Sequence, residues 1–230
     1  LRNDNILTGY QNTILYTVTA TVVKVSLTVT SAYVLSRKDV PGKNLFTFLI
    51  VFTMFFSGGL IPTYLLVKQL HLVNTMWALI LPSAVSVFHL IITRTFFQTT
   101  ISDELLEASQ MDGCSDWRFF FRIVLPLSMP IIAVVALFTA VQQWNSYFSA
   151  LVYLQDWSKQ PLQVVLRQIL VQNEVDLDMI TDIDEAGERM KATEQMKYAL
   201  IIFASAPMLV LYPFLQRYFV KGMMIGSLKG

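Results

Sequence analysis

The residues of this chain that could carry out catalysis are few and lie far apart. The 230 residues include two histidines and one cysteine, Cys114, and no pair of carboxylates falls inside an apolar stretch. Catalysis and metal binding need several such groups together, so we expect no catalytic residue and no metal site. The sequence also contains no Gly-x-x-x-x-Gly-Lys-Ser/Thr phosphate loop, so we expect the chain to bind no ATP by that route and no other cofactor.

A few side chains are suited to binding a sugar. Sugar recognition needs aromatic faces for stacking and polar groups that replace water, because an unpaired hydroxyl is costly in a dry site. Trp144, Asn145 and Tyr147 supply both near the end of an apolar stretch. The same residues also suit the aromatic belt found at membrane interfaces, and both interpretations remain open.

Two ionisable residues, Lys24 and His89, lie inside apolar stretches. At such positions ionisable side chains usually face a bundle interior or a water-filled cavity, so both are candidates for a substrate pathway. Lys24 could attract a carboxylate of a ligand, or it could pair with a group on another protein chain. The alternative for His89 is an ordinary packing role.

These residues must be positioned by membrane-spanning helices. Hydrophobic residues make up 54% of the chain and charged residues 14%, well below the roughly 25% charged typical of soluble domains. Five apolar blocks are long enough to cross a bilayer as helices, which predicts an all-α polytopic membrane protein. The blocks lie near residues 12–36, 45–67, 75–97, 126–152 and 198–219. Glycines and prolines inside them predict kinks, at Gly58, Gly59, Pro62, Pro82, Pro130, Pro207 and Pro213.

The basic residues between the blocks predict the orientation. Arg37, Lys38 and Lys43 follow the first block, and the face that they share with residues 98–125 carries more basic than acidic residues. That face is expected to be cytoplasmic, with the carboxyl end inside and the amino end outside. The number of predicted spans is odd, and the chain starts LRNDNILTGY, with neither a start methionine nor a signal peptide pattern. We therefore expect that an earlier span is missing.

Between the third and fourth blocks, residues 101–130 form an ordered polar segment. Ser102 can cap a helix that ends at Asp112-Gly113, and Leu105 and Met111 would be its exposed apolar side chains. A second helical segment at 117–122 leads to Pro126, which can start the next span. Spacing alone leaves an ordinary interfacial loop equally favoured.

The residues of this segment resemble the signature of ABC importer permeases. Glu107-Ala108-Ser109 is followed by Gly113 and then by Ile123-x-Leu125-Pro126 at the family's spacing, with Ser109 in place of the second alanine. The resemblance implies that segment 101–126 contains a coupling helix that docks on a separate cytoplasmic ATPase dimer, which binds ATP and Mg²⁺. The implied coupling residues are Glu107, Ala108, Ser109, Asp112, Gly113, Leu125 and Pro126.

Other stretches narrow the resemblance to the carbohydrate-uptake branch, specifically the maltose G-type subunit. They are residues 12–17 (NTILYT), 144–147 (WNSY) and 221–230 (KGMMIGSLKG). That family has an ABC type I importer transmembrane domain of six spans, of which this chain would show five. The resemblance implies that the tail contacts the ATPase through Gly222, Gly226 and Lys229, with a frayed terminus as the alternative.

Residues 52–64 (FTMFFSGGLIPTY) resemble a sub-branch that imports larger oligosaccharides, including alginate-derived and pectin-derived ones. We therefore expect residues 1–230 to be one permease domain of the bacterial plasma membrane, importing an acidic rather than a neutral oligosaccharide. The implied partners are a second homologous permease, the ATPase dimer, an extracytoplasmic sugar-binding protein and lipid, with no nucleic acid. A membrane-embedded enzyme and a self-sufficient secondary transporter are less favoured alternatives.

The polar segment 155–197 is expected to be extracytoplasmic. Leu162, Val165, Leu166, Ile169 and Leu170 recur at helical spacing after a proline, which predicts an amphipathic helix. Such a helix would lie on the membrane surface or against another span. The acidic stretch that follows is typical of a solvated loop, and the resemblance implies that this segment faces the sugar-binding protein.

Overall fold

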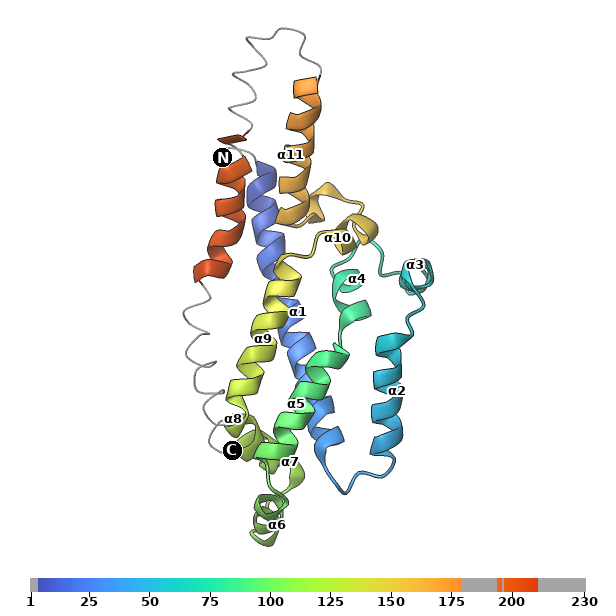
Figure 1. Ribbon diagram of the computed structural model, residues 1–230, viewed down its shortest axis with the longest axis vertical. Coiled ribbons are helices and arrows are strands. Elements are labelled where there is room, and N and C mark those ends of the chain that lie inside the picture. The colour runs from blue at the N-terminus through green and yellow to red at the C-terminus, as the bar shows by residue number, and fades with distance from the viewer. Residues whose placement is uncertain (1–3, 179–193, 196, 211–230) are drawn as a thin grey trace.

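One long helix forms the spine of the molecule. The computed structural model describes residues 4–178, 194, 195 and 197–210, and every regular element among them is helical. Helix α1 (Asp4–Ser36) is continuous over 33 residues and runs along much of the length of the structure (Figure 1). Its many threonines and valines have a weak intrinsic preference for helix, so packing rather than propensity holds it together.

The other helices are shorter, and three pairs of them are bent at a break. The elements after α1 are α2 (Lys43–Phe55), α3 (Leu60–Gln69), α4 (Trp77–Ile80), the 3-10 turn η1 (Leu81–Ser83), α5 (Val87–Thr100), α6 (Asp103–Met111), α7 (Asp116–Phe119), the π-helical turn η2 (Phe120–Val124), α8 (Leu125–Leu127), α9 (Met129–Trp144), α10 (Phe148–Tyr153), the 3-10 turn η3 (Trp157–Lys159), α11 (Leu162–Asp178) and a helix at Lys197–Val210. The bend between α2 and α3 is 115°, that between the run α4–η1 and α5 is 55°, and that between the run α7–α8 and α9 is 75°.

The predicted spans correspond to these helices, and the middle three are each bent at a break. Among the described residues one helix can cross a membrane by length and composition, or up to four if each bent pair counts as one span. Gly59, with a φ of +86°, Pro82 and Pro130 lie at or beside the three breaks and confirm the kinks predicted there. The kink predicted at Pro207 is not observed, because the helix Lys197–Val210 continues through it, and Pro213 lies outside the described residues. The block at 198–219 is helical to Val210, and the rest of it lies outside the described residues.

α1 contributes to three separate apolar clusters along its length. Ile6 packs in a cluster shared with α9, α11 and the helix Lys197–Val210. Tyr16 belongs to a second cluster, shared with α3, α4, α10 and α11. Tyr33, near the other end, belongs to a third, shared with α5, α7 and η2, which we call the inner cluster. A single rigid element therefore joins the two ends of the molecule.

Segment 155–162 is tied to the amino-terminal half of α1. The Asn12 amide donates to the carbonyls of Ser158 (2.8 Å) and Gln160 (3.1 Å), and the Tyr16 hydroxyl donates to that of Lys159 (2.9 Å). The NTILYT motif thus consists partly of side chains that hold this segment on the helix.

The predicted amphipathic helix after Pro161 is confirmed as α11. Its residues Leu162, Val165 and Leu166 are buried, and the helix packs against α1. The approach is close at Gly9, where a Cβ atom would come within 3.2 Å of the Leu162 Cα. The second of the two predicted positions, against another span, is therefore the one observed.

Replacing Thr13 by valine should destabilise the fold without changing the shape of this contact. The buried Thr13 hydroxyl accepts a hydrogen bond from the Leu162 backbone N–H at 2.8 Å. Valine has no hydroxyl, so this N–H would lose its acceptor. We expect the free energy of unfolding in detergent to fall by about 1–3 kcal/mol. Thr30→Val, on the exposed face of the same helix, is the control and should change it little.

Candidate functional site

Helix α6 lies at the opposite end of α1 from α11 (Figure 1) and forms as the sequence predicts. The Ser102 hydroxyl accepts a hydrogen bond from the Leu105 N–H (3.4 Å), and Asp103 lies in the first turn, where a carboxylate favours the helix dipole. The helix ends at Asp112, and Gly113 follows with a φ of +71°. This left-handed conformation is the predicted glycine stop.

The signature residues of α6 divide between two faces. Glu107 and Ala108 are exposed, whereas Ser109 is buried and its hydroxyl donates to the Leu106 carbonyl at 2.7 Å. The Ser109 carbonyl in turn accepts from the Cys114 N–H at 2.9 Å, which closes the turn after the helix. Close approach by another protein is therefore possible at Ala108, while Ser109 serves the turn.

Exposed apolar side chains flank the turn between α6 and α7. Met111 is 89% exposed, and the exposed rings of Trp117 and Phe121 stack with their centroids 6.1 Å apart. The prediction that Leu105 would also be exposed is wrong, because its side chain is partly buried and packs against the inner cluster. Exposed apolar side chains of this size indicate contact with another surface.

The second helical segment differs from its predicted course. α7 continues into the π-helical turn η2 and the short α8, and the long helix α9 begins only at Met129 after a 75° bend. Pro126 therefore starts the three-residue helix α8 rather than the long one. Leu125 packs against the inner cluster, whereas Pro126 is exposed. Single π-helical turns are frequent at functional sites.

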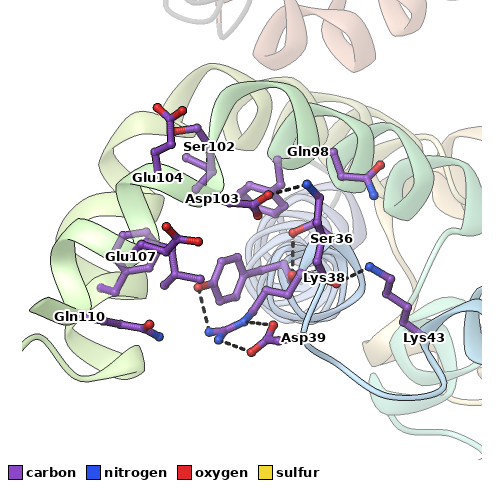
Figure 2. Close-up of a pocket in the computed structure, with 16 residues that line it drawn as sticks. Ser36, Lys38, Asp39, Lys43, Gln98, Ser102, Asp103, Glu104, Glu107 and Gln110 are labelled. Atoms are coloured by element: carbon purple, nitrogen blue, oxygen red, sulfur yellow. Dashed lines mark hydrogen bonds and ion pairs between the residues drawn. The ribbon is translucent and has the colours of Figure 1, made fainter.

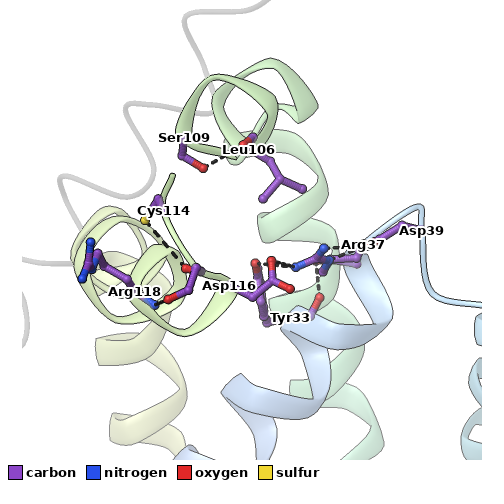
Figure 3. A network of polar contacts seen from close by, with 10 residues as sticks. Tyr33, Arg37, Asp39, Leu106, Ser109, Cys114, Asp116 and Arg118 are labelled. Atoms are coloured by element: carbon purple, nitrogen blue, oxygen red, sulfur yellow. Dashed lines mark hydrogen bonds and ion pairs between the residues drawn. The ribbon is translucent and has the colours of Figure 1, made fainter. Parts of the chain in front are cut away.

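Arg37, directly after α1, binds the start of α7 (Figure 3). Its Nη1 atom donates to Asp116 at 2.9 Å, and its Nε and Nη2 atoms donate to the two oxygens of Asp39 at 2.8 and 2.6 Å. Nη1 also lies 3.5 Å from the Tyr33 hydroxyl. Hydrogen bonding to this guanidinium lowers the pKa of the Asp39 carboxyl, so the pair stays ionised at neutral pH.

Lys38 makes a second ion pair, with Asp103 at the start of α6, at 2.5 Å. The pair lies beside a pocket of about 870 Å³ between the ends of α1 and α5 and the face of α6 (Figure 2). Lys43, Gln98 and Glu107 line the same pocket. Residues 101–126, which we call the central segment, are thus attached to the end of α1 by two ion pairs and by the inner cluster.

The sugar-binding candidates near the other end of α9 separate into two environments. Trp144 is 3% exposed, and its indole N–H donates to the Ala204 carbonyl at 3.0 Å. Asn145 is exposed and lies with Trp144 along a pocket of about 510 Å³ beside the helix Lys197–Val210. Tyr147 lies elsewhere, beneath the guanidinium of Arg167 at 5.2 Å from the ring centroid. The structure brings only the first two together.

Lys24 is buried in the interior of the bundle, whereas His89 is only half-buried. Lys24 is 8% exposed, and its ammonium donates to the Ser83 hydroxyl (2.9 Å) and to the Gln143 amide oxygen (3.3 Å). The half-buried His89 ring stacks on Phe138 with centroids 5.9 Å apart. No cluster of potential metal ligands occurs among the described residues, and the tail candidates Gly222, Gly226 and Lys229 lie outside them.

Sequence reasoning missed the partners of these charged groups. Nothing in the spacing connects Arg37 with Asp116, because 79 residues separate them and only the fold brings them together. The contact of Lys24 with Gln143 could have been predicted, because both are polar side chains inside apolar blocks and such groups seek each other as partners.

The fold and this site together define a class of protein, a helical membrane transport subunit that carries a rigid segment at one end. The chain belongs to the family of binding-protein-dependent transport system inner membrane components, whose model matches residues 6–225. It is therefore the permease subunit of an ABC importer, as the signature predicts.

Similar proteins identify the branch. The polygalacturonan/rhamnogalacturonan transport system permease protein YtcP of Bacillus subtilis (strain 168) is 49% identical over 215 residues, which cover 93% of this chain and 74% of that protein. Protein LplC of the same organism is 48% identical over 217 residues, covering 94% and 72%.

A solved structure, a bacterial ABC transporter involved in the import of the acidic polysaccharide alginate, matches with a TM-score of 0.82. Its sequence is 33% identical, and the match covers 95% of this chain and 76% of that one. The type I importer fold and the sugar-importer branch are thereby confirmed.

Replacing Gly113 by alanine should loosen the turn after α6. Open space surrounds the position, so the cost comes from the positive φ and should be about 1–2 kcal/mol. Hydrogen exchange of the Cys114 amide should therefore accelerate by roughly 5- to 30-fold. Gly58→Ala, at a glycine without positive φ, is the control and should leave this exchange unchanged.

Proposed function

We propose that this permease imports an acidic oligosaccharide and is driven by a separate ATPase dimer that docks on the cytoplasmic segment 98–125. It forms half of a translocation pathway with a second homologous permease. The single observation that carries the docking proposal is α6, a capped and stopped helix whose outer face presents Glu107 and Ala108 and whose inner face is packed on the bundle.

The character of the surface around α6 supports docking. Ala108 lets a partner approach the backbone, and the exposed Met111, Trp117 and Phe121 would lose contact with water in a complex. Exposed basic residues at this end, Arg118 and Arg122, agree with a cytoplasmic position by the positive-inside rule. The carboxyl end is proposed to be cytoplasmic on the same argument, and its tail to contact the ATPase.

Energy conversion is assigned to the partner. ATP and Mg²⁺ would be held by the ATPase subunits, because this chain has no phosphate-loop sequence. The contribution of the permease is mechanical, since it passes the movement of the docked ATPase to its helices. Segment 155–197 includes α11, which lies at the opposite end of α1 from α6 (Figure 1), and is proposed to face the extracytoplasmic sugar-binding protein.

Lys24 supports an acidic substrate. Its ammonium contacts only neutral oxygen acceptors, those of Ser83 and Gln143, and no carboxylate among the described residues forms an ion pair with it. A buried charge of this kind gains from an anionic partner. Ser83 is exposed at the break between η1 and α5, so the ammonium lies one hydrogen bond from the surface.

Further hydroxyl groups lie on the same side of α1. The hydroxyls of Thr17 and Thr21 are buried without a hydrogen-bond partner among the described residues, and they precede Lys24 by seven and three positions. Residues that are three and seven positions apart lie on the same face of a helix. Sugar hydroxyls could satisfy these groups if the face opens during transport. A neutral sugar is the competing substrate, and Lys24 would then pair with the second permease.

Docking is tested by comparing two glutamates on one helix. Glu107→Ala, at a signature position, should reduce sugar uptake and ATPase retention in the purified complex by about fivefold or more, within the usual range of coupling energies. Glu104→Ala, one turn earlier and equally exposed, should leave both unchanged. Equal behaviour of the two variants in reconstituted vesicles would remove Glu107 from the docking surface.

The substrate is tested at Lys24. Lys24→Met should weaken uptake of a galacturonate oligosaccharide by roughly 10- to 150-fold, because one lost charged contact is worth roughly 1.5–3 kcal/mol, while uptake of a neutral oligosaccharide is unaffected. The exposed Lys68→Met is the control. Loss of the second permease from the complex would instead assign Lys24 to subunit pairing, and unchanged uptake would remove it from the pathway.

A further inference from the structure

The end of α1 holds the first residues of two helices in the same way. Each helix begins with a serine cap and an aspartate, Ser102-Asp103 for α6 and Ser115-Asp116 for α7. The two aspartates are bound by neighbouring residues of α1's end: Asp103 by Lys38 and Asp116 by Arg37. The junction between the central segment and α1 is therefore made of two adjacent ion pairs.

The two ion pairs differ in how firmly they fix geometry. The Lys38 side chain is 80% exposed and has one carboxylate partner, an arrangement that solvent screens strongly. The Arg37 side chain is 13% exposed, and its planar guanidinium bridges two carboxylates and reaches the Tyr33 hydroxyl. A fork of fixed donors orients its partners in a way that a single exposed ammonium does not.

An apolar contact lies next to the Arg37 ion pair. The Tyr33 ring packs on Phe120 with centroids 4.9 Å apart and edge-on to Phe97 at 5.9 Å. Phe120 is the first residue of the π-helical turn that follows α7. Polar and apolar contacts thus join α7 and η2 to the last turn of α1, and α1 continues without a break to the side chains that hold segment 155–162.

We propose that Arg37 is a positioning residue for coupling: through Asp116 it makes α1 follow the central segment when the ATPase moves that segment. The bridge to Asp39 holds the guanidinium in place, and the hydrogen bond to Asp116 carries the displacement of α7. Because α1 is continuous, the displacement reaches segment 155–162 at the other end of the molecule. This inference rests on the proposed docking of the ATPase.

The test uses the full complex of both permeases, the ATPase dimer and the sugar-binding protein in proteoliposomes. Arg37→Gln and Asp116→Asn should retain the ATPase, yet the stimulation of ATP hydrolysis by sugar-loaded binding protein should fall by about fivefold or more. The double variant should be no worse than either single one, because both remove the same contact. Arg37→Lys, which keeps the charge but not the fork, should be intermediate, and Lys38→Gln should behave as the wild type.

Full stimulation in Arg37→Gln and Asp116→Asn would overturn the proposal, as would additive losses in the double variant. Loss of the ATPase from these complexes would also overturn it, because the contact would then serve assembly. Docking itself is checked separately by cross-linking from Met111→Cys in a Cys114→Ser background. Failure of that cross-link to the ATPase would reject the proposed function, whatever the Arg37 variants show.

Discussion

The structure depends on the packing of one continuous helix, α1, against α4, α5, α9 and α11. α1 supplies residues to three apolar clusters, and its two ends are tied by polar contacts to segments that lie far apart in space. Three other apolar blocks are bent at or beside a glycine or proline, so none of these three connects the two ends of the molecule as directly. Under the proposed coupling, a displacement at one end of α1 reaches the other end without crossing a break in the helix.

The interior of this bundle is unusually polar for a chain with so many apolar residues. Thr13, Thr28 and Gln143 are buried together with Lys24, while no residue of α2 is buried at all. In a membrane, buried polar groups beside exposed phenylalanines are physically reasonable, because lipid tails or another apolar surface can cover phenylalanines, whereas polar groups must find partners inside. Helix association then relies on hydrogen bonds and close packing, of which the Gly9 contact with α11 is an example.

The agreement between sequence and structure is best where short-range chemistry decides. The cap at Ser102 and the glycine stop at Gly113 could be predicted because each depends on residues within one helical turn. The predicted start of the long helix at Pro126 was wrong. A proline is compatible with the first turn of a helix but does not set the length or orientation of that helix, and the bend before Met129 depends on the surrounding packing. The exposure of Leu105 was predicted wrongly for a related reason. Residue spacing shows which side chains share a face of the helix, but not whether that face meets solvent or the inner cluster.

The sequence by itself determined the class of protein, the all-helical architecture and the position of α6, because hydropathy, end signals and motif spacing are properties of the linear chain. Only the tertiary structure decided which residues meet. The Arg37–Asp116 pair, the partners of Lys24 and the burial of Trp144 each join segments at least 59 residues apart. Such contacts are selected by how helices pack, and local preference carries no information about them.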